Sequence, residues 1–310
     1  MKTAFVFPGQ GAQYIGMAMD YVAADPELAE ILRSFDQQHQ TDLAGIMANG
    51  PEDLLKETRY TQPAILFHSI CALRSLRKLS GIKPDYVAGH SLGEFTAMVA
   101  AGVLSETDGM HLVHKRGEFM IKANEGAPFA MAAIIGLEAD AVIEVCKESE
   151  SLGLVRAVNF NTPIQTVISG SAAGVQAAME LAKSRGAKRA LPLVVGGPFH
   201  TPMIQKAGIW LEQEMRGMSF ADAACPVVSN VDALPDSKPE VLRQKLVRQI
   251  TSPVRWVESI RNMREAGVTR FIEFGPQKVL SGMIKNIDKD AEVFSVDKLE
   301  EVAVIAELLS

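Results

Sequence analysis

The sequence predicts an α/β fold in which helices cover both faces of a mostly parallel sheet. Over most of the 310 residues, short apolar runs of strand length alternate with longer segments of helical periodicity. This order favours parallel strands joined by crossover helices. Between residues 126 and 195 the order changes to βαββαβ, which is typical of a ferredoxin-like unit. We therefore expect a large subdomain made of residues 1–125 and 196–310, with residues 126–195 inserted as a small one.

The first part of the chain supplies elements of the large subdomain. The apolar run Thr3–Phe7 ends at Pro8 and is expected to be a buried strand, followed by the loop Gly9–Gln13. Further on, Gly102 predicts the end of one helix and Ser105 the N-cap of another. In chain order we expect helices over 14–38 with a break near Pro26, over 61–79, over 92–101 and over 105–124, and a strand over 85–89.

The remaining elements follow from the same patterns. In the insert we expect strands over 129–135, 155–160, 166–169 and 188–195, and helices over 140–149 and 172–185. After it we expect strands over 227–230, 270–274 and 292–296, with helices over 203–215, 239–250, 254–266 and 279–287 and a final helix. The return to longer α/β alternation indicates that both flanking parts build one sheet.

Charge and cysteine content exclude several classes of protein. The formal net charge of -6 argues against a nucleic-acid binder, whose surface should be basic. No apolar run reaches membrane-spanning length, and the four apolar residues before Pro8 are too few for a signal peptide. Cys71, Cys146 and Cys225 are far apart and odd in number, which indicates reduced thiols and no zinc site. We expect a cytoplasmic protein that needs no metal.

A Gly-x-Ser-x-Gly motif, Gly89-His90-Ser91-Leu92-Gly93, stands between a predicted strand and a predicted helix. A serine at such a sharp turn projects its hydroxyl above the sheet edge, and the flanking glycines permit the tight backbone. The helix that follows also favours negative charge at its N-terminus. The plainer alternative is that Ser91 only caps that helix. The strand–turn–helix context favours a nucleophile.

A serine nucleophile needs a base, and His200 is the candidate among six histidines. The other five lie on predicted helices or within the Ser91 motif. His200 stands in the loop Gly196–Pro202, after a strand and before a helix, where α/β folds place functional residues. The alternative, a histidine held in a rigid proline turn, is left open by the spacing alone.

Arg116 falls inside the apolar stripe of the helix predicted over 105–124. The stripe consists of Leu112, Val113, Phe119, Met120 and Ala123. An arginine on a buried face is costly without an anionic partner. It could form an internal salt bridge or extend its charged end to solvent. It could also bind a substrate carboxylate through two hydrogen bonds.

Several motifs resemble, in order, the malonyl-CoA:acyl carrier protein transacylase family along essentially the whole chain. They are FPGQGAQ (7–13), GHSLGEF (89–95), Arg116, NFN (159–161), PFH (198–200), VRQ (247–249) and EFGP (273–276). The resemblance implies an α/β-hydrolase-like large subdomain with a ferredoxin-like small one. The combination is specific, although each motif alone would not be. The Gly196-Gly197 pair departs from the bulkier or polar residues common in the family.

The resemblance also implies roles for individual residues. Ser91 would be the nucleophile and His200 the general base, oriented by the backbone carbonyl of Gln249. The N–H groups of Gln10 and Leu92 would form the oxyanion hole. Arg116 would bind the malonyl carboxylate, and Phe199, like Leu92, matches the malonyl-selective members.

The resemblance also implies substrates and a partner protein, and rival functions stand beside it. The implied substrates are malonyl-CoA and the phosphopantetheine thiol of acyl carrier protein, in fatty-acid or polyketide synthesis, with no cofactor beyond the coenzyme A carried by the substrate. Carrier proteins are acidic, so the basic residues Lys188, Arg189 and Lys285 are candidates for docking, with solvated surface charge as the alternative. Two rival functions are an acyl-carrier-protein acyl hydrolase and a non-catalytic docking protein. A dinucleotide site at Gly9-Gln10-Gly11 is disfavoured because Tyr14 replaces the third glycine.

Overall fold

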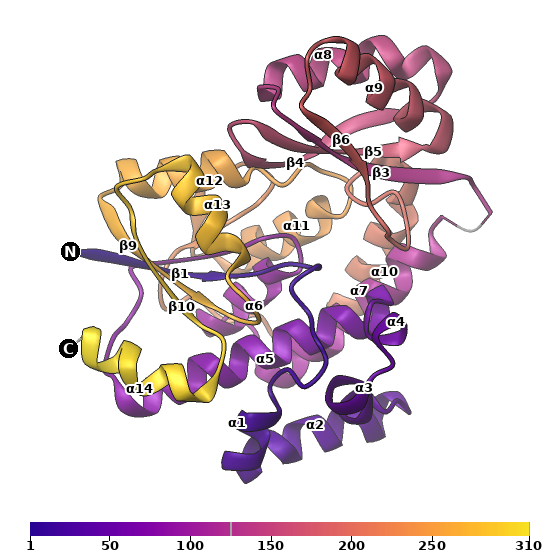
Figure 1. Ribbon diagram of the computed structural model, residues 1–310. Coiled ribbons are helices and arrows are strands. Elements are labelled where there is room, and N and C mark those ends of the chain that lie inside the picture. The colour runs from indigo at the N-terminus through magenta and orange to yellow at the C-terminus, as the bar shows by residue number, and fades with distance from the viewer. Residues whose placement is uncertain (125, 310) are drawn as a thin grey trace.

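The chain folds around two separate β-sheets (Figure 1). A computed structural model describes residues 1–124 and 126–309. The larger sheet has the strand order β10-β9-β1-β2-β7-β8 and is parallel except for the β7–β8 pair. Its strands are β1 Lys2–Phe7, β2 Tyr86–Gly89, β7 Val227–Val228, β8 Pro235–Asp236, β9 Val268–Phe274 and β10 Glu292–Val296. The mostly parallel sheet and the fold class predicted from the sequence are confirmed.

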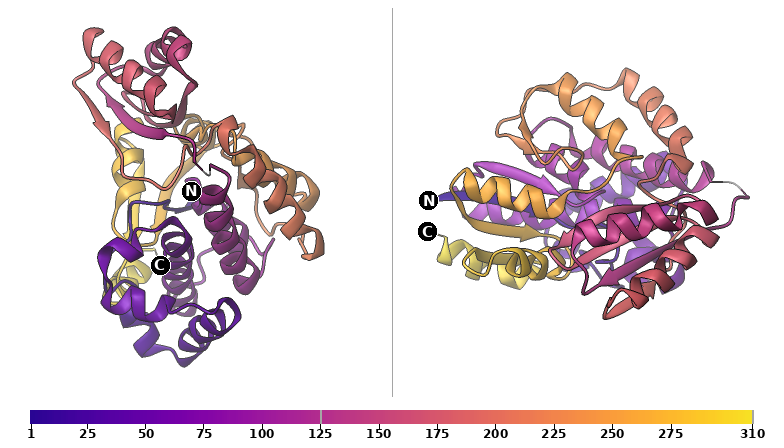
Figure 2. Two further views of the ribbon diagram at one scale, coloured as in Figure 1. Left: turned by 90° about the vertical axis from the view of Figure 1, so that its right-hand side faces the viewer. Right: turned by 90° about the horizontal axis from the view of Figure 1, so that it is seen from above.

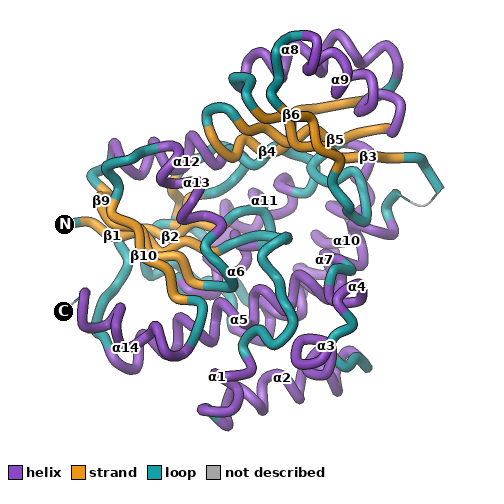
Figure 3. The backbone as a smooth tube through the Cα atoms, in the orientation of Figure 1, coloured by secondary structure: helices purple, strands orange, loops and turns teal. Residues whose placement is uncertain are grey.

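Helices cover both faces of this sheet because its central strand is apolar on both sides. Alternate residues of β1 enter different cores, with Phe5 and Phe7 in one and Ala4 and Val6 in the other. Packed in the first core are α5 (Thr58–Leu79), α6 (Gly93–Ala100) and α14 (Leu299–Leu308), and in the second α12 (Trp256–Glu265) and α13 (Val279–Ile287). Figure 3 shows this arrangement of helices around the sheet.

Further helices extend the large subdomain beyond the sheet. Helix α7 (Glu106–Lys122) packs against α5 and carries Arg116. Ser105 caps α7 as predicted, accepting a hydrogen bond from the Asp108 N–H. The bounds of this outer group are α1 Met19–Ala24, α2 Pro26–His39, α3 Leu43–Asn49, α4 Glu52–Leu55, α7 Glu106–Lys122, α10 Gln205–Glu214 and α11 Pro239–Gln249, with 3₁₀ turns at Pro202–Ile204 and Met215–Gly217.

The second sheet has the βαββαβ order expected of the insert. Its spatial order, β4-β5-β3-β6 with every pair antiparallel, is that of a ferredoxin-like unit. The elements are β3 Phe129–Ile135, α8 Ala139–Ser149, β4 Val155–Thr162, β5 Gln165–Ser171, α9 Ala172–Ser184 and β6 Arg189–Pro192, with a 3₁₀ turn at Glu150–Leu152. Figure 2 shows this unit projecting from one end of the large sheet. The predicted boundary at Glu125 lies outside the described residues.

Some element boundaries differ from those predicted. The strand predicted over 188–195 ends at Pro192, because only the Leu193 N–H still bonds to β3 and Val194 is fully exposed. The first helix begins at Met19 instead of Tyr14. Helices α3 and α4 and strand β8 were not predicted, since each is too short to show a periodic pattern. Within the described residues no helix is long and apolar enough to cross a membrane.

Candidate active site

The candidate site lies where three neighbouring parallel strands end. Phe7 at the end of β1 pairs with Gly89 at the end of β2, and β2 pairs with β7 on its other side. The residues that follow these strands, Gln10, Ser91 and Asn230, therefore meet at one edge of the sheet, the usual place for a site in an α/β fold. The His90 N–H donates to the Phe7 carbonyl at 3.0 Å and joins the first two loops.

Ser91 occupies a strained turn between β2 and α6. Its φ is 52°, a left-handed conformation that is uncommon for a residue with a side chain. The turn depends on close backbone approaches, because a Cβ on Gly89 would lie 1.9 Å from the Gly93 carbonyl and one on Gly93 would lie 2.1 Å from the Phe7 oxygen. The Ser91 N–H donates to Asn230 Oδ1 at 2.8 Å, and this bond supports the strained turn.

The Ser91 hydroxyl contacts His200, 109 positions later in the chain. The separation from Ser91 Oγ to His200 Nε2 is 2.9 Å, and the other ring nitrogen, Nδ1, lies 2.9 Å from the Gln249 carbonyl oxygen. A carbonyl can only accept, so Nδ1 carries the proton and Nε2 is free to accept from Ser91. The hydroxyl is thus engaged by a base and does not cap α6, which has no side-chain cap.

Arg116 reaches the same hydroxyl from α7. It is 1% exposed, and it forms no ion pair with any residue that the structure describes. Its Nη1 donates to Gln62 Oε1 at 2.8 Å, while Nη2 donates to Ser91 Oγ and Gln249 Oε1, each at 2.9 Å. The Phe95 ring lies against the guanidinium, 5.5 Å from ring centroid to Cζ. The internal salt bridge and the solvent-directed side chain are both ruled out as accounts of this arginine.

Burial shapes the electrostatics of these groups. Burial first, and then the Arg116 charge, lower the pKa of His200 to about 3. Burial also lowers the pKa of Arg116 to about 9, against which the Glu94 charge acts. At neutral pH the site therefore holds a neutral imidazole that can accept a proton and a guanidinium that is charged and short of counter-charge.

A cavity of about 240 Å³ opens beside Ser91, between the large and small subdomains. Met131 and Ala133 of β3, and Asn159 and Asn161 of β4, form part of its wall. Arg116 is the only lining side chain with a permanent charge among the described residues. The small sheet is joined to the large subdomain here, because the Phe160 N–H donates to the Val254 carbonyl at 3.0 Å. Such a cavity suits a small ligand that carries one negative charge.

The other predicted substrate contacts line this cavity as well. Gln10, Leu92 and Phe199 are all on its wall. No hydrogen bond engages the N–H of Gln10 or of Leu92 within the part of the chain that the structure describes, so both remain available to an incoming oxygen. The unusual Gly197 has a packing reason, since a Cβ there would lie 3.0 Å from Phe199 Cε1.

The three basic residues proposed for carrier docking lie outside the cavity. Lys188 and Arg189 are exposed at the start of β6, and Lys285 is exposed on α13. Each is close in sequence to a lining residue, Leu193 after β6 and Met283 on α13. None of the three forms an ion pair within the described residues. Their surroundings are those of surface cations near the cavity, and docking stays a prediction.

Four polar residues of the site were not predicted from the sequence. Gln62 binds Arg116, and Asn161 Oδ1 accepts from His90 Nε2 at 2.8 Å. Asn230 holds the Ser91 turn, and Glu94 binds both Asn230 and Gln249. Asn161 and Glu94 belong to motifs that carried the family resemblance, which was the available signal. Gln62 lies in an apolar helix and Asn230 after a short strand, and no local pattern singles them out.

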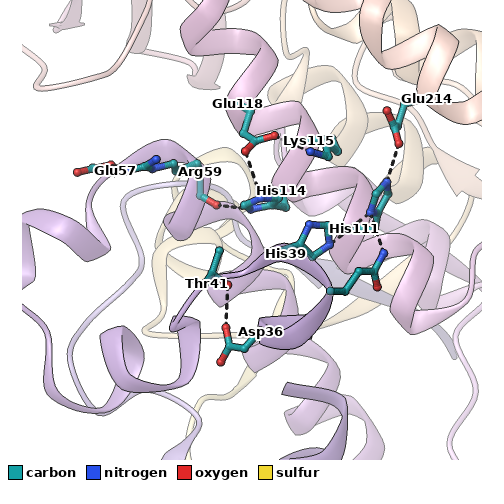
Figure 4. A network of polar contacts seen from close by, with 11 residues as sticks. Asp36, His39, Thr41, Glu57, Arg59, His111, His114, Lys115, Glu118 and Glu214 are labelled. Carbon is teal, nitrogen blue, oxygen red and sulfur yellow. Dashed lines mark hydrogen bonds and ion pairs between the residues drawn. The ribbon is translucent and has the colours of Figure 1, made fainter. Parts of the chain in front are cut away.

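Three of the remaining histidines, none of which lines the cavity, cluster on α2 and α7 (Figure 4). His39 Nε2 lies 3.3 Å from His111 Nδ1, and His111 Nε2 lies 2.8 Å from Glu214 Oε1. His114 Nδ1 lies 3.2 Å from the Arg59 carbonyl oxygen. Among the described residues no group of three histidine, cysteine or acidic side chains could hold a metal ion. The contacts of the cluster join α7 to α2, α5 and α10.

Comparisons with known proteins agree with this geometry. The family model for the acyl transferase domain matches residues 4–306. The malonyl CoA-acyl carrier protein transacylase of Bacillus subtilis (strain 168) is 43% identical over 309 residues, covering 99% of this chain and 97% of the relative. The solved structure of the transacylase of the same name from Coxiella burnetii has a TM-score of 0.95 at 36% identity, covering 99% of this chain and 97% of that one.

A further solved structure bears on the family assignment. It is a solved complex described as a type II PKS acyl-carrier protein with its malonyl-transacylase. A chain of this complex matches the present protein with a TM-score of 0.94 at 37% identity, covering 100% of this chain and 100% of that one. Two subdomains, a strained serine beside a histidine, and a buried arginine at the cavity accompany this similarity in sequence and fold. The chain belongs to the malonyl-CoA:acyl carrier protein transacylase family.

Proposed function

We propose that this protein transfers a malonyl group from coenzyme A to the phosphopantetheine thiol of acyl carrier protein through a malonyl ester on Ser91. The observation that carries the proposal is the position of one hydroxyl between two groups. Ser91 Oγ lies 2.9 Å from the basic nitrogen of His200 and 2.9 Å from a buried guanidinium nitrogen of Arg116. A base and an unpaired cation beside one nucleophile suit an acyl group that bears a carboxylate.

The first half-reaction uses the loop geometry. His200 Nε2 takes the hydroxyl proton as Ser91 Oγ attacks the thioester carbonyl, and the oxyanion accepts hydrogen bonds from the Gln10 and Leu92 N–H groups. Each such donor is worth about 2.7–4 kcal/mol in other enzymes. The C–S bond then breaks, and the imidazolium returns its proton to the departing coenzyme A thiolate. The Gln249 carbonyl keeps the ring in the required tautomer throughout.

Arg116 gives the reaction its preference for malonyl. The guanidinium is held by neutral oxygens from Gln62, Ser91 and Gln249. A malonyl carboxylate supplies the missing anionic partner and can bind two N–H groups at once. An acetyl group leaves the buried charge without such a partner, so its transfer is disfavoured.

The second half-reaction reverses the first with a different thiol. The phosphopantetheine thiol loses its proton to His200 and attacks the ester carbonyl, the C–O bond breaks, and Ser91 recovers its proton. No step requires a metal or redox cofactor. A structural relative in complex with an acyl-carrier protein supports this partner. A cytoplasmic location, where malonyl-CoA and carrier protein would both be accessible, is part of the proposal.

Intact-mass spectrometry after mixing with malonyl-CoA tests the proposal. We expect a malonyl adduct that maps to Ser91 and is transferred when acyl carrier protein is added. Ser91→Ala should form no adduct, and His200→Ala should form it about 10²–10⁴-fold more slowly. Burial raises the pKa of Cys146 to about 12 and that of Cys225 to about 11, so neither thiol competes at neutral pH.

The same experiment separates the alternatives. Rapid release of free malonate without a carrier would identify a hydrolase. No adduct under any condition would identify a non-catalytic docking protein. An adduct on a cysteine would overturn the assignment of Ser91.

A further inference from the structure

Glu94, in the first turn of α6, is a carboxylate with no solvent contact and no direct contact with Ser91 Oγ or with the cavity. Its Oε2 accepts two hydrogen bonds, one from the Asn230 N–H at 3.1 Å and one from Gln249 Nε2 at 2.7 Å. A buried carboxylate is expensive to keep, and ordinary helix packing does not require one. Burial raises its pKa to about 7, although the hydrogen bonds from Gln249 and Asn230 oppose the increase.

The Gln249 side chain shows what this carboxylate does. Its Nε2 donates to Glu94 Oε2, to the Ser91 carbonyl at 2.9 Å and, more weakly, to Asn230 Oδ1 at 3.3 Å. Its Oε1 accepts from Arg116 Nη2 at 2.9 Å. The three acceptors therefore surround the Nε2 end of the amide, and the Arg116 donor lies at the Oε1 end. Reversing the amide would place an N–H₂ against Arg116 and an oxygen against a carboxylate.

We propose that Glu94 is a positioning residue for malonyl selectivity: it fixes the direction of the Gln249 amide, and the amide oxygen then fixes the Arg116 guanidinium at Ser91. The inference rests on the proposed function, in which Arg116 binds the malonyl carboxylate. Glu94 touches neither substrate nor Ser91 Oγ and acts through Gln249.

This arrangement separates two duties of Gln249. Its backbone carbonyl orients His200, while its side chain orients Arg116. Loss of Glu94 leaves the backbone carbonyl in place but frees the amide to turn. Asn230, which supports the Ser91 turn, also loses the acceptor of its N–H but keeps its own bond to the Ser91 N–H. The chemistry at Ser91 should therefore be affected less than carboxylate binding.

Two substitutions at one position test the proposal. Glu94→Gln keeps an oxygen that can accept from both Asn230 and Gln249, whereas Glu94→Ala removes it. We measure KM and kcat for loading from malonyl-CoA and acetyl-CoA, per active site titrated with a fluorophosphonate. Glu94→Ala should lower the malonyl-to-acetyl ratio of kcat/KM by about tenfold, the loss expected for one charge-assisted hydrogen bond. The change should appear mainly in KM for malonyl-CoA.

Glu94→Gln should hold the ratio within about threefold of wild type, because its neutral acceptor replaces the charged one in the same geometry. Gln249→Leu should reproduce the malonyl-to-acetyl ratio of Glu94→Ala. The double variant that combines both changes should lower the ratio little further, because both changes act on the same contact with Arg116. Glu273→Gln is the matched control: this carboxylate is equally buried but bonds to Leu280 and Ser281. It should lower the melting temperature and leave the ratio unchanged.

Two results would overturn the inference. One is an unchanged malonyl-to-acetyl ratio in Glu94→Ala, whether both loading activities per titrated site hold or fall equally. The other is a Glu94→Gln variant as unselective as Glu94→Ala, which would assign the effect to charge instead of position. Wild-type protein that forms no malonyl adduct at all would instead refute the proposed function, and the inference with it.

Discussion

Arg116 and Ser91, 25 positions apart on different helices and loops, are joined by a 2.9 Å hydrogen bond from Nη2 to Oγ. The same hydroxyl lies 2.9 Å from His200 Nε2, so it donates to a base and accepts from a cation at once. The guanidinium also donates to two amide oxygens, those of Gln62 and Gln249. A substrate carboxylate would compete with these neutral acceptors, and a charged acceptor forms the stronger hydrogen bond.

We predict that Arg116→Ala reduces malonyl loading while acetyl loading holds or rises. A charge-assisted hydrogen bond contributes about 1.5–3 kcal/mol and the guanidinium can form two, so the malonyl rate should fall by about 10²-fold or more. Acetyl loading should not fall because the unpaired charge that it faces is gone. Arg116→Lys should retain only part of the malonyl loading of wild type, since lysine keeps the charge but lacks the planar guanidinium that forms two parallel hydrogen bonds. Side-by-side loading with both thioesters measures this. Parallel loss of both, with a lowered melting temperature, would indicate a structural role instead.

The pH dependence of loading should differ between kcat/KM and kcat. Burial and the Arg116 charge lower the pKa of His200 to about 3, so the free enzyme keeps a neutral base down through pH 5. Because kcat/KM reports the free enzyme, it should show no acid limb near the ordinary histidine value of about 6.5. A bound carboxylate offsets the Arg116 charge and raises the pKa of His200. The acid limb of kcat should therefore lie at a higher pH than that of kcat/KM. Single-turnover loading from pH 5 to 8 checks this, and an acid limb of kcat/KM near pH 6.5 would contradict it.

Reversing Lys188 and Arg189 to glutamate should weaken transfer to acyl carrier protein and leave loading from malonyl-CoA unchanged. Both side chains are exposed and lie outside the cavity, so they can meet a partner protein without touching the acyl group. The effect should diminish as salt is added, because exposed charges are screened within about 10 Å at 0.1 M ionic strength. Lys285→Glu should act in the same direction. Each half-reaction is followed separately, and an equal fall in both would refute a docking role.

The histidine cluster should make part of the stability depend on pH. Burial first, and then the His114 and His111 charges, lower the pKa of His39 to about 4 from its ordinary 6.5. Between these values the unfolded chain binds a proton that the folded chain does not, so this contribution to stability is lost as pH falls from 6.5 towards 4. His39→Asn cannot titrate. The difference in free energy of unfolding between wild type and variant should therefore shrink from pH 7.5 to 5.5, as measured by urea titration. A constant difference would exclude the effect.

The large sheet and the insert were predictable because each depends on local pattern. Strand β3 and helix α13 have the bounds expected from the sequence, since apolar period and flanking residues determine them locally. The predicted strand over 227–230 shows where this fails. Its last two residues leave the sheet, and Asn230 turns to hold the Ser91 backbone. A hydrogen bond to a residue 139 positions away leaves no local pattern.

By itself, the sequence determined the order of elements, the elbow at Ser91 and the anomaly of a charged Arg116 in an apolar stripe, because all three are properties of neighbouring residues. It left open whether Arg116 pairs with an acid, and it indicated the Gln249 carbonyl as the partner of His200 only through the family resemblance. Only the tertiary structure decided these points, by bringing Gln62, Gln249 and Ser91 around one guanidinium and the Gln249 carbonyl against the imidazole. The physical reason is that a buried charge is stabilised by whichever dipoles the packed helices direct towards it, and these come from elements distant in the chain.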